Sequence, residues 1–367
     1  MTRPDRVLMT VDAVGGVWRY AVDAARGLAQ RGVECLLVGL GPRPDATACA
    51  EVSAIAGVRL TWLDAPLDWL APEERALGRI GPELEDLALG HGCSLLHLNA
   101  PSLAVGLRGG LPVVVASHSC IVTWWQAMMH DAPLPAAWRW QRARNAMGLA
   151  AADVVLSPSH SHAAALRAAY RLPRPIEVVY NASLVRLAAD ERLPMALAAG
   201  RWWDAGKNGE VLDAAAALVP FPVVLAGALE GPDGSSFEPR HAIAAGLLEP
   251  PRLLAAMGRA AIFVAPSRYE PFGLAVLEAA GTGAALVLAD IPTFRELWHD
   301  AALFCPADDA AAFAATMQQV VGDRALREEL GTAAFERART FTADRQAERL
   351  LAVYGRFFEA AANAEAS

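Results

Sequence analysis

The chain contains almost no lysine. Lys207 is its single lysine, although lysine and arginine together number 32 among 367 residues. Position 207 therefore either requires an ammonium group or is the one exception to a general coding preference for arginine. Aspartate and glutamate number 40, which gives a formal net charge of −8. This acidic balance argues against a nucleic-acid partner and against an anionic membrane as the main partner.

Cysteine is also scarce, and several motifs are missing. The five cysteines are scattered without a C-x-x-C pair, which argues against a zinc knuckle and a disulfide framework. No Asp-x-Asp sequence occurs, so the usual sign of a metal-held nucleotide diphosphate is absent. We expect no metal site and no cofactor. His160 and His162 follow Ser159, which is typical of a helix start rather than of a metal centre.

Long apolar runs are missing as well. No apolar stretch reaches the roughly 18 residues of a membrane span, and the one near the N-terminus is too short for a signal peptide. We therefore expect a cytoplasmic protein, and leave open a peripheral contact with the inner face of the membrane.

What the chain does contain is a globular composition, with 54% hydrophobic and 20% charged residues. Its length predicts two domains. Short apolar runs alternate with helical periodicity, and continuous apolar strands of this kind are typical of parallel sheets covered on both faces. The predicted strands are 6–11, 34–40, 94–98, 112–117, 153–157 and 176–179, followed by 194–200, 222–227, 261–266, 284–289 and 301–305.

The fold class is therefore α/β, with two doubly wound Rossmann-like domains. We predict an N-terminal domain over 1–185, a second domain over 186–345, and a C-terminal helix over 346–367 that packs back on the N-terminal domain. The linker lies around 181–194. Ligands bind at the carboxyl ends of parallel strands, so loops of both domains are expected to face a shared cleft.

The first candidate site is the loop that follows strand 6–11. Gly15 and Gly16 stand there between a strand and a helix. Glycine lets the backbone approach a phosphate, and a helix start supplies free N–H donors. A tight turn without a ligand explains the pair equally well.

The second candidate is the loop "GRWWDAGKN" after strand 194–200. Arg201 and Lys207 lie six positions apart in it. Two cations at the carboxyl end of a strand can hold a diphosphate, the arginine by its planar fork and the lysine as a point charge. The alternative is two solvated surface cations.

The third candidate is the stretch "PSRYEPFGLAVLEAAGTG". Glu270 is expected at a loop tip, and the amides of Phe272, Gly273 and Leu274 begin the following helix, where they can bind phosphate oxygens or sugar hydroxyls. Glu278 stands inside an otherwise apolar helix and needs a partner, for which the paired hydroxyls of a ribose are suitable. The alternative is that both glutamates are structural or surface acids.

His118 directly follows the predicted strand 112–117, which gives it a cleft position, although a lone histidine is often structural. The tryptophans 124, 125, 138 and 140 suit a sugar platform, a membrane contact or core packing equally well.

The third stretch resembles the E-x7-E signature of retaining glycosyltransferases of family 4, which have the GT-B fold. "GGVWRY" is similar to their glycine loop, "GRWWDAGKN" to their Arg/Lys phosphate loop, and "FTADRQAERLLAVY" to their terminal helix. The chain departs from the family where Trp-Arg-Tyr follows the glycines and where "YNAS" lacks a glycine after Asn181.

The resemblance implies roles for the candidate residues. Arg201 and Lys207 would neutralise the diphosphate of a nucleotide sugar, Gly16 would face it from the other domain, and Glu278 would hold the ribose. Glu270 and the backbone of 272–274 would hold the donor sugar. His118 would lie near its reacting face, and Leu248 would read the nucleobase.

The resemblance also implies a front-face displacement in which the leaving phosphate oxygen takes the acceptor's proton. The expected function is transfer of a hexose from a nucleotide diphosphate sugar to a glycan, a lipid-linked or a small-molecule acceptor, without a metal. The alternatives are a GT-B nucleotide-sugar epimerase and a non-catalytic two-domain sugar-binding protein.

Overall fold

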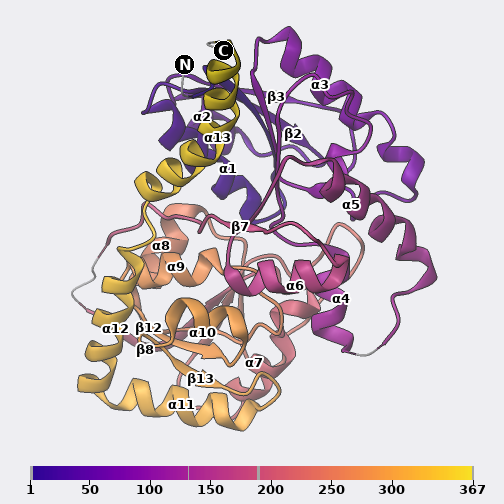
Figure 1. Ribbon diagram of the computed structural model, residues 1–367. Helices are drawn as coiled ribbons and strands as arrows, with labels where there is room; N and C mark the ends of the chain where they lie inside the picture. Colours follow the sequence, from indigo (N-terminus) through magenta and orange to yellow (C-terminus); the bar gives the residue numbers. More distant parts are fainter. Residues whose placement is uncertain (1–2, 131, 188–190, 366–367) are drawn as a thin grey trace. The chain divides into compact units, whose positions relative to one another are not determined.

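The computed structural model describes residues 3–130, 132–187 and 191–365, and its described side chains end at Glu359. The chain forms two compact units (Figure 1). Unit 1 comprises Met1–Asn181 and Ala343–Ser367, and unit 2 comprises Ala182–Thr342. The first boundary falls inside the predicted linker 181–194, of which residues 188–190 lie outside the described residues.

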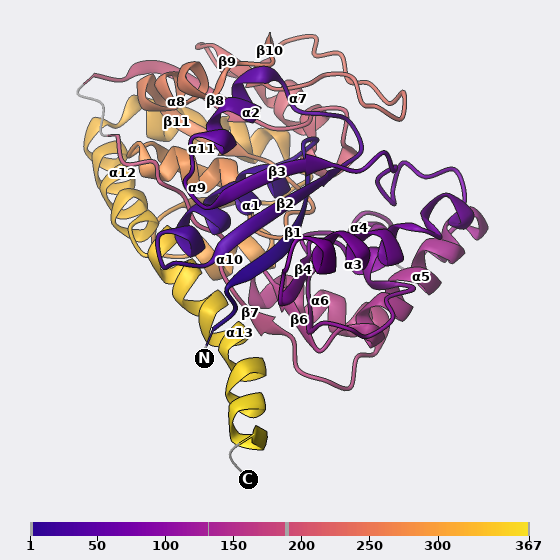
Figure 2. The same cartoon turned by 90° about the horizontal axis from the view of Figure 1, so that it is seen from above.

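Unit 1 is built on a seven-stranded sheet in the order β3-β2-β1-β4-β5-β6-β7. Every neighbouring pair among these described strands is parallel. Figure 2 shows β3, β2, β1 and β4 side by side. The strands are β1 (Arg6–Asp12), β2 (Glu34–Leu40), β3 (Val58–Trp62), β4 (Leu95–Leu98), β5 (Val113–Ala116), β6 (Val154–Ser157) and β7 (Glu177–Val178).

The sheet of unit 1 has an apolar core on each face. Val7 and Met9 of β1 belong to one cluster, and Leu8 between them belongs to the other. A strand whose two faces are both buried must be apolar throughout, which explains its uninterrupted hydrophobic sequence. The helices are α1 (Gly16–Ala29), α2 (Ala46–Ser53), α3 (Ile80–Gly90), α4 (Ile121–Met129), α5 (Arg139–Ala151), α6 (His160–Tyr170) and α13 (Ala343–Glu365), with the short η1 (Glu74–Leu77), η2 (Pro101–Ala104) and η3 (Ala136–Trp138).

The last helix, α13, packs on α1 of unit 1. Its buried residues Leu350, Val353 and Tyr354 belong to the same apolar cluster as α1 and β1. The two helices approach closely at Gly27, where an added Cβ would lie 2.9 Å from the Cβ of Ala347. The chain therefore finishes in the unit in which it began.

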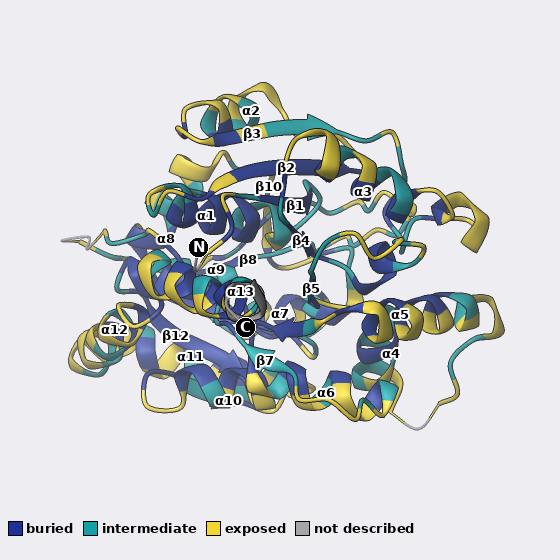
Figure 3. Ribbon diagram, turned by 45° about the horizontal axis from the view of Figure 1, so that its top comes forward, coloured by how far each residue is buried: buried dark blue, intermediate teal, exposed yellow. Residues whose placement is uncertain are grey.

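Unit 2 is built on a six-stranded parallel sheet in the order β10-β9-β8-β11-β12-β13. Strands β11 and β12 are buried along their whole length, as the dark colour of β12 in Figure 3 shows. The strands are β8 (Leu193–Ala199), β9 (Val223–Ala226), β10 (Ile243–Gly246), β11 (Ala260–Ala265), β12 (Ala285–Ala289) and β13 (Leu303–Cys305). The helices are α7 (Gly209–Ala216), α8 (Pro250–Arg259), α9 (Leu274–Gly281), α10 (Pro292–Trp298), α11 (Ala310–Gly322) and α12 (Arg324–Ala338), with the short η4 (Ala205–Lys207).

Two strands are present that the sequence did not predict. β3 and β10 each lie at an edge of their sheet. β3 is only partly buried after Val58, and three of the four residues of β10 are exposed. Edge strands need little apolar surface, so their sequences carry no long hydrophobic run. Within the described residues, no helix has both the length and the apolar character needed to cross a membrane.

Candidate functional site

The carboxyl edge of the unit 2 sheet brings two of the predicted residues into contact. Lys207 lies in η4 beyond β8, Glu270 lies beyond β11, and these two strands are neighbours in the sheet. The Lys207 ammonium forms an ion pair and a hydrogen bond with Oε2 of Glu270. Their side chains are only 19% and 15% exposed. Such shielding makes the pair stronger than one on an open surface.

The backbone holds the two loops together. The carbonyl of Gly206 accepts a hydrogen bond from the Arg268 amide at 2.9 Å. The next anchor is Asn208, which is buried and has a positive φ of 60°. Its Nδ2 donates to the carbonyls of Pro266 at 2.9 Å and of Ala307 at 2.6 Å. Asn208 thus ties together the loops that follow β8, β11 and β13.

The helix start predicted after Glu270 is present. Gly273 precedes α9 with a φ of 92°, a left-handed conformation that favours glycine. A Cβ there would also lie 3.0 Å from Phe294 and 3.3 Å from Cγ of Glu270. The Phe272 ring is buried in the core of unit 2, 5.7 Å from the ring of Phe341, so only its backbone can serve a ligand. Leu274 is the first residue of α9, and Glu278 lies partly buried in the middle of this helix.

Arg201 lies two residues beyond β8 and makes different contacts from Lys207. Its Nη2 lies 3.2 Å from Oδ2 of Asp204, and its guanidinium stands 5.3 Å from the centre of the Trp203 ring. Among the described residues it makes no ion pair with Glu270. Leu248 follows β10, the edge strand of the same sheet, and is partly exposed. The structure therefore places both in loops beyond strand ends, outside the Lys207–Glu270 contact.

In unit 1, the glycine loop follows β1. Gly15 precedes α1 in an extended conformation, and Gly16 is the exposed first residue of the helix. The first turn of α1 carries no acidic side chain. Arg19, where the chain departs from the pattern of the family it resembles, is turned to internal partners: it pairs with Asp23 and lies 2.8 Å from Glu51. The positive end of this 14-residue helix thus begins at glycines, with Asp12 of the preceding strand accepting from the Val14 amide at 3.0 Å.

His118 lies beyond β5 in a group of hydrogen-bonded side chains. Its Nε2 is 2.9 Å from Oδ1 of Asn99, and its ring stands 4.2 Å from the ring of Tyr20. Burial, together with the neighbouring His97 and His162, lowers the pKa of His118 to about 3. The imidazole is therefore neutral at physiological pH, and can accept a hydrogen bond from a hydroxyl group.

Asn208, Asn99 and Tyr20 were not among the residues predicted for the site. Asn208 stands beside the predicted Lys207, and Asn99 directly follows the predicted strand 94–98. A polar amide immediately after a buried strand is a signal that could have identified Asn99. Tyr20 lies in α1 and carries no such signal.

The tryptophans after His118 support one another. The rings of Trp125 and Trp138 meet edge to face at 5.2 Å, and Nε1 of Trp125 donates to the Ala132 carbonyl at 2.9 Å. These contacts join α4 to the segment before α5. They give both rings a structural role.

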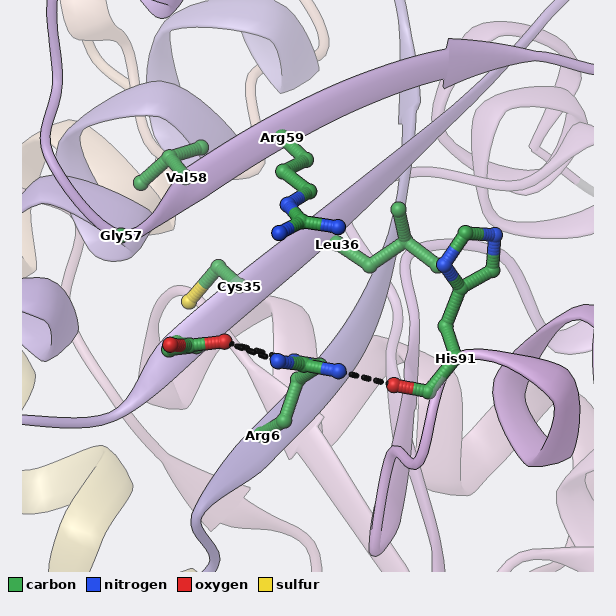
Figure 4. A pocket seen from close by; sticks show the side chains of 8 residues that line it. Arg6, Cys35, Leu36, Gly57, Val58, Arg59 and His91 are labelled. Atoms are coloured by element: carbon green, nitrogen blue, oxygen red, sulfur yellow. Dashed lines mark hydrogen bonds and ion pairs between the residues drawn. The ribbon is translucent and has the colours of Figure 1, made fainter.

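A pocket at the opposite edge of the unit 1 sheet lies apart from these residues. It is a cavity of about 200 Å3 beside Arg6, Glu34 and Val58, at the amino ends of β1, β2 and β3. Figure 4 shows Arg6 bridging to a carboxylate, that of Glu34, and to the carbonyl of His91. Ligands of parallel α/β sheets bind at the carboxyl ends, so this pocket is not part of the candidate site.

Comparison with known proteins assigns the chain to a family. The model described as Glycosyltransferase Family 4 matches residues 14–182, and the model described as Glycosyl transferases group 1 matches residues 239–337. The chain belongs to the family 4 glycosyltransferases. The first match covers most of unit 1 after β1, and the second covers unit 2 from β10 to most of α12.

Solved structures show the same GT-B fold. A sucrose-phosphate synthase from Thermosynechococcus elongatus is 20% identical, with a TM-score of 0.79, over 97% of this chain and 100% of its own. Anabaena Alr3699/HepE, solved in complex with UDP-glucose, is 17% identical, with a TM-score of 0.70, over 95% of this chain and 98% of its own.

A curated relative resembles part of the chain more closely in sequence. The D-inositol 3-phosphate glycosyltransferase of Jonesia denitrificans is 38% identical over 106 residues, which are 28% of this chain and 25% of that protein. The match to the curated relatives thus spans about a quarter of their length. Fold and family are therefore settled for this family 4 member, while the substrates must be argued from its own residues.

Proposed function

We propose that the protein is a metal-independent, retaining glycosyltransferase that moves a hexose from a nucleotide diphosphate sugar to an acceptor hydroxyl. The observation that carries this proposal is the contact between Lys207 and Glu270 at the carboxyl edge of the unit 2 sheet. An ammonium group has three N–H donors. It can keep Glu270 as one partner and offer the other donors to diphosphate oxygens. The carboxylate can then accept hydrogen bonds from sugar hydroxyls.

In the proposed reaction, the bond between the anomeric carbon and the diphosphate oxygen breaks. A bond to the acceptor oxygen forms on the same face, and the acceptor's proton passes to an oxygen of the leaving diphosphate. No side chain is required as a nucleophile. The protein would stabilise the negative charge that develops on the diphosphate through Lys207, Arg201 and the amides of 272–274, as preorganised donors do in other enzymes.

The remaining roles belong to the same proposal. Glu278 would hold the ribose, Leu248 would contact the nucleobase, Gly15 and Gly16 would approach the phosphate, and His118 would lie beside the sugar.

The deciding experiment offers the purified protein UDP- and GDP-sugars with and without an acceptor lysate. The UDP-glucose complex of Alr3699/HepE makes UDP-glucose the first donor to test. We expect nucleotide release that depends on the acceptor, and a product whose anomeric configuration, read by NMR, matches that of the donor. Isomerised sugar without nucleotide release would show an epimerase, and binding without turnover would show a sugar-binding protein.

The acceptor class can be read from the same assay. The lysate is divided into polysaccharide, lipid extract and small-molecule fractions, and the fraction that restores nucleotide release identifies the class. For a lipid-linked acceptor we propose contact with the membrane surface, which co-flotation of the protein with vesicles that contain the lipid extract would detect. Activity confined to the small-molecule fraction would remove the membrane from the proposal.

A further inference from the structure

The backbone of Thr10 fixes the orientation of the Asn99 amide. Nδ2 of Asn99 lies 2.5 Å from the Thr10 carbonyl oxygen, which can only accept a hydrogen bond. The Asn99 backbone amide also donates to the Thr10 hydroxyl at 2.8 Å. Turning the amide over would place Oδ1 against a carbonyl oxygen, two acceptors without a proton between them. Oδ1 must therefore point away from Thr10.

The atom that Oδ1 meets is Nε2 of His118, at 2.9 Å. An amide oxygen only accepts, so Nε2 must carry the proton and Nδ1 must carry the lone pair. Among the described residues, Nδ1 of His118 has no hydrogen-bond partner. The Asn99 side chain is 7% exposed, so water competes little for this contact.

We propose that Asn99 is a positioning residue that holds His118 as the Nε2–H tautomer, so that Nδ1 accepts a hydrogen bond from a sugar hydroxyl. The sugar in this inference rests on the proposed function, whereas the tautomer does not. Thr10 contributes by fixing the amide that selects the tautomer. The other tautomer would set the Nε2 lone pair against Oδ1 and offer the sugar a donor instead of an acceptor.

The groups that face His118 keep the ring neutral. His97 comes from β4, His162 from α6 and Tyr20 from α1. His162 contacts Oγ of Ser117 through Nε2 at 3.2 Å, and Tyr20 contacts Nε2 of His97 at 3.3 Å. Burial lowers the pKa of both His97 and His162 to about 4. Because these neighbours are uncharged, the hydrogen bond to Asn99 determines which tautomer of His118 is present.

The test measures the tautomer directly in the ligand-free protein. Nitrogen-15 NMR separates protonated from unprotonated imidazole nitrogens, and His118→Gln identifies the His118 signals by their loss. We expect an unprotonated Nδ1 in the wild type and a mixture of tautomers in Asn99→Leu. A protonated Nδ1 in the wild type would overturn the proposal even if Asn99→Leu does not fold. So would an unchanged tautomer in folded Asn99→Leu.

Steady-state kinetics then test whether Asn99 affects the reaction through His118 or only stabilises the fold. Loss of one hydrogen bond to the sugar should lower kcat/KM of Asn99→Leu about three- to tenfold. An inactive wild type with the expected tautomer would defeat the proposed function alone. Normal kcat/KM in Asn99→Leu with scrambled tautomers would defeat the hydroxyl contact.

Discussion

Different kinds of side chain lie at the carboxyl edges of the two sheets, neutral ones in unit 1 and charged ones in unit 2. In unit 1 the side chains around His118 are neutral and joined by hydrogen bonds, with Asn99 and Tyr20 as its neighbours. In unit 2 the corresponding contact is an ion pair between Lys207 and Glu270. Neutral side chains that form hydrogen bonds can distinguish one hydroxyl group of a ligand from another. The Lys207 ammonium, by contrast, can bind an anion. Under the proposed function, we expect Lys207 and Glu270 of unit 2 to face the charged part of a substrate and His118 of unit 1 to face a polar, uncharged part.

The largest effect should come from removing the ammonium of unit 2. We expect Lys207→Ala to lower turnover of a nucleotide sugar about a hundredfold or more, because one preorganised donor to developing charge is lost. Glu270→Ala should have a similar effect by freeing the lysine. Initial rates of nucleotide release, with circular dichroism to verify folding, measure both.

Arg295→Ala is the matched control for that comparison. Arg295 also pairs with an acid in unit 2, Asp290, at 2.7 Å, but its side chain is 50% exposed. We expect its turnover to stay near normal. Near-normal activity in Lys207→Ala and Glu270→Ala would remove the assigned roles and leave the ion pair as a structural contact.

The next effect concerns how unit 2 holds its loops. Asn208→Ala should lower the free energy of unfolding by about 2 to 3 kcal/mol, since two carbonyls lose their donor and alanine is strained at a φ of 60°. Asn208→Gly tolerates this φ and loses only the amide, so it should be less destabilised. Urea unfolding measures both variants. Equal losses would show that backbone strain contributes nothing.

These loop contacts show how much of the candidate site could be predicted from the sequence. Glu270, Lys207 and His118 were predicted to follow buried strands, and each of them does. The hydrophobic strands that precede these residues can be recognised in the sequence, which made their positions predictable. The sequence could not tell which strands are neighbours, and the Lys207–Glu270 contact depends on β8 lying next to β11.

Other features were beyond sequence reasoning for physical reasons. The contact of Asn99 with Thr10 requires β4 beside β1, paired so that Met9 lies opposite His97. Arg201 is predicted to serve the diphosphate together with Lys207, and the structure adds an ion pair with Asp204 in its own loop. A short-range partner of this kind depends on loop conformation, which residue spacing does not fix.

The stability of the two units should depend differently on pH in the acidic range. The pKa of His97 and of His162 is about 4 in the folded chain, against an ordinary value of 6.5. At these two histidines the unfolded state therefore binds more protons between pH 4 and 6.5, so their contribution to the stability of unit 1 falls as the pH falls through this range. The loss at pH 5 is about 2 kcal/mol for each histidine.

Unit 2 has a different dependence in the same range. Burial alone would raise the pKa of Asp213, but hydrogen bonds from the amides of 240–242 outweigh it and bring the pKa below its usual 3.8. A carboxylate of this kind costs stability only at lower pH. Unfolding followed from pH 7 to 4.5 should therefore weaken unit 1 first, and His162→Gln should reduce the slope. A slope unchanged by that variant would contradict the assignment.

The smallest expected effect concerns the hydrogen bond between Tyr354 of α13 and His97 in unit 1. The hydroxyl of Tyr354 is 2.6 Å from Nδ1 of His97, and both side chains are fully buried. Tyr354→Phe keeps the packing and removes one hydrogen bond, so unfolding free energy should fall by about 1 kcal/mol. A double-mutant cycle with His97→Phe isolates the pair, because the second change should then cost less than it does alone. Additive losses would mean that the contact between Tyr354 and His97 contributes nothing to the attachment of α13.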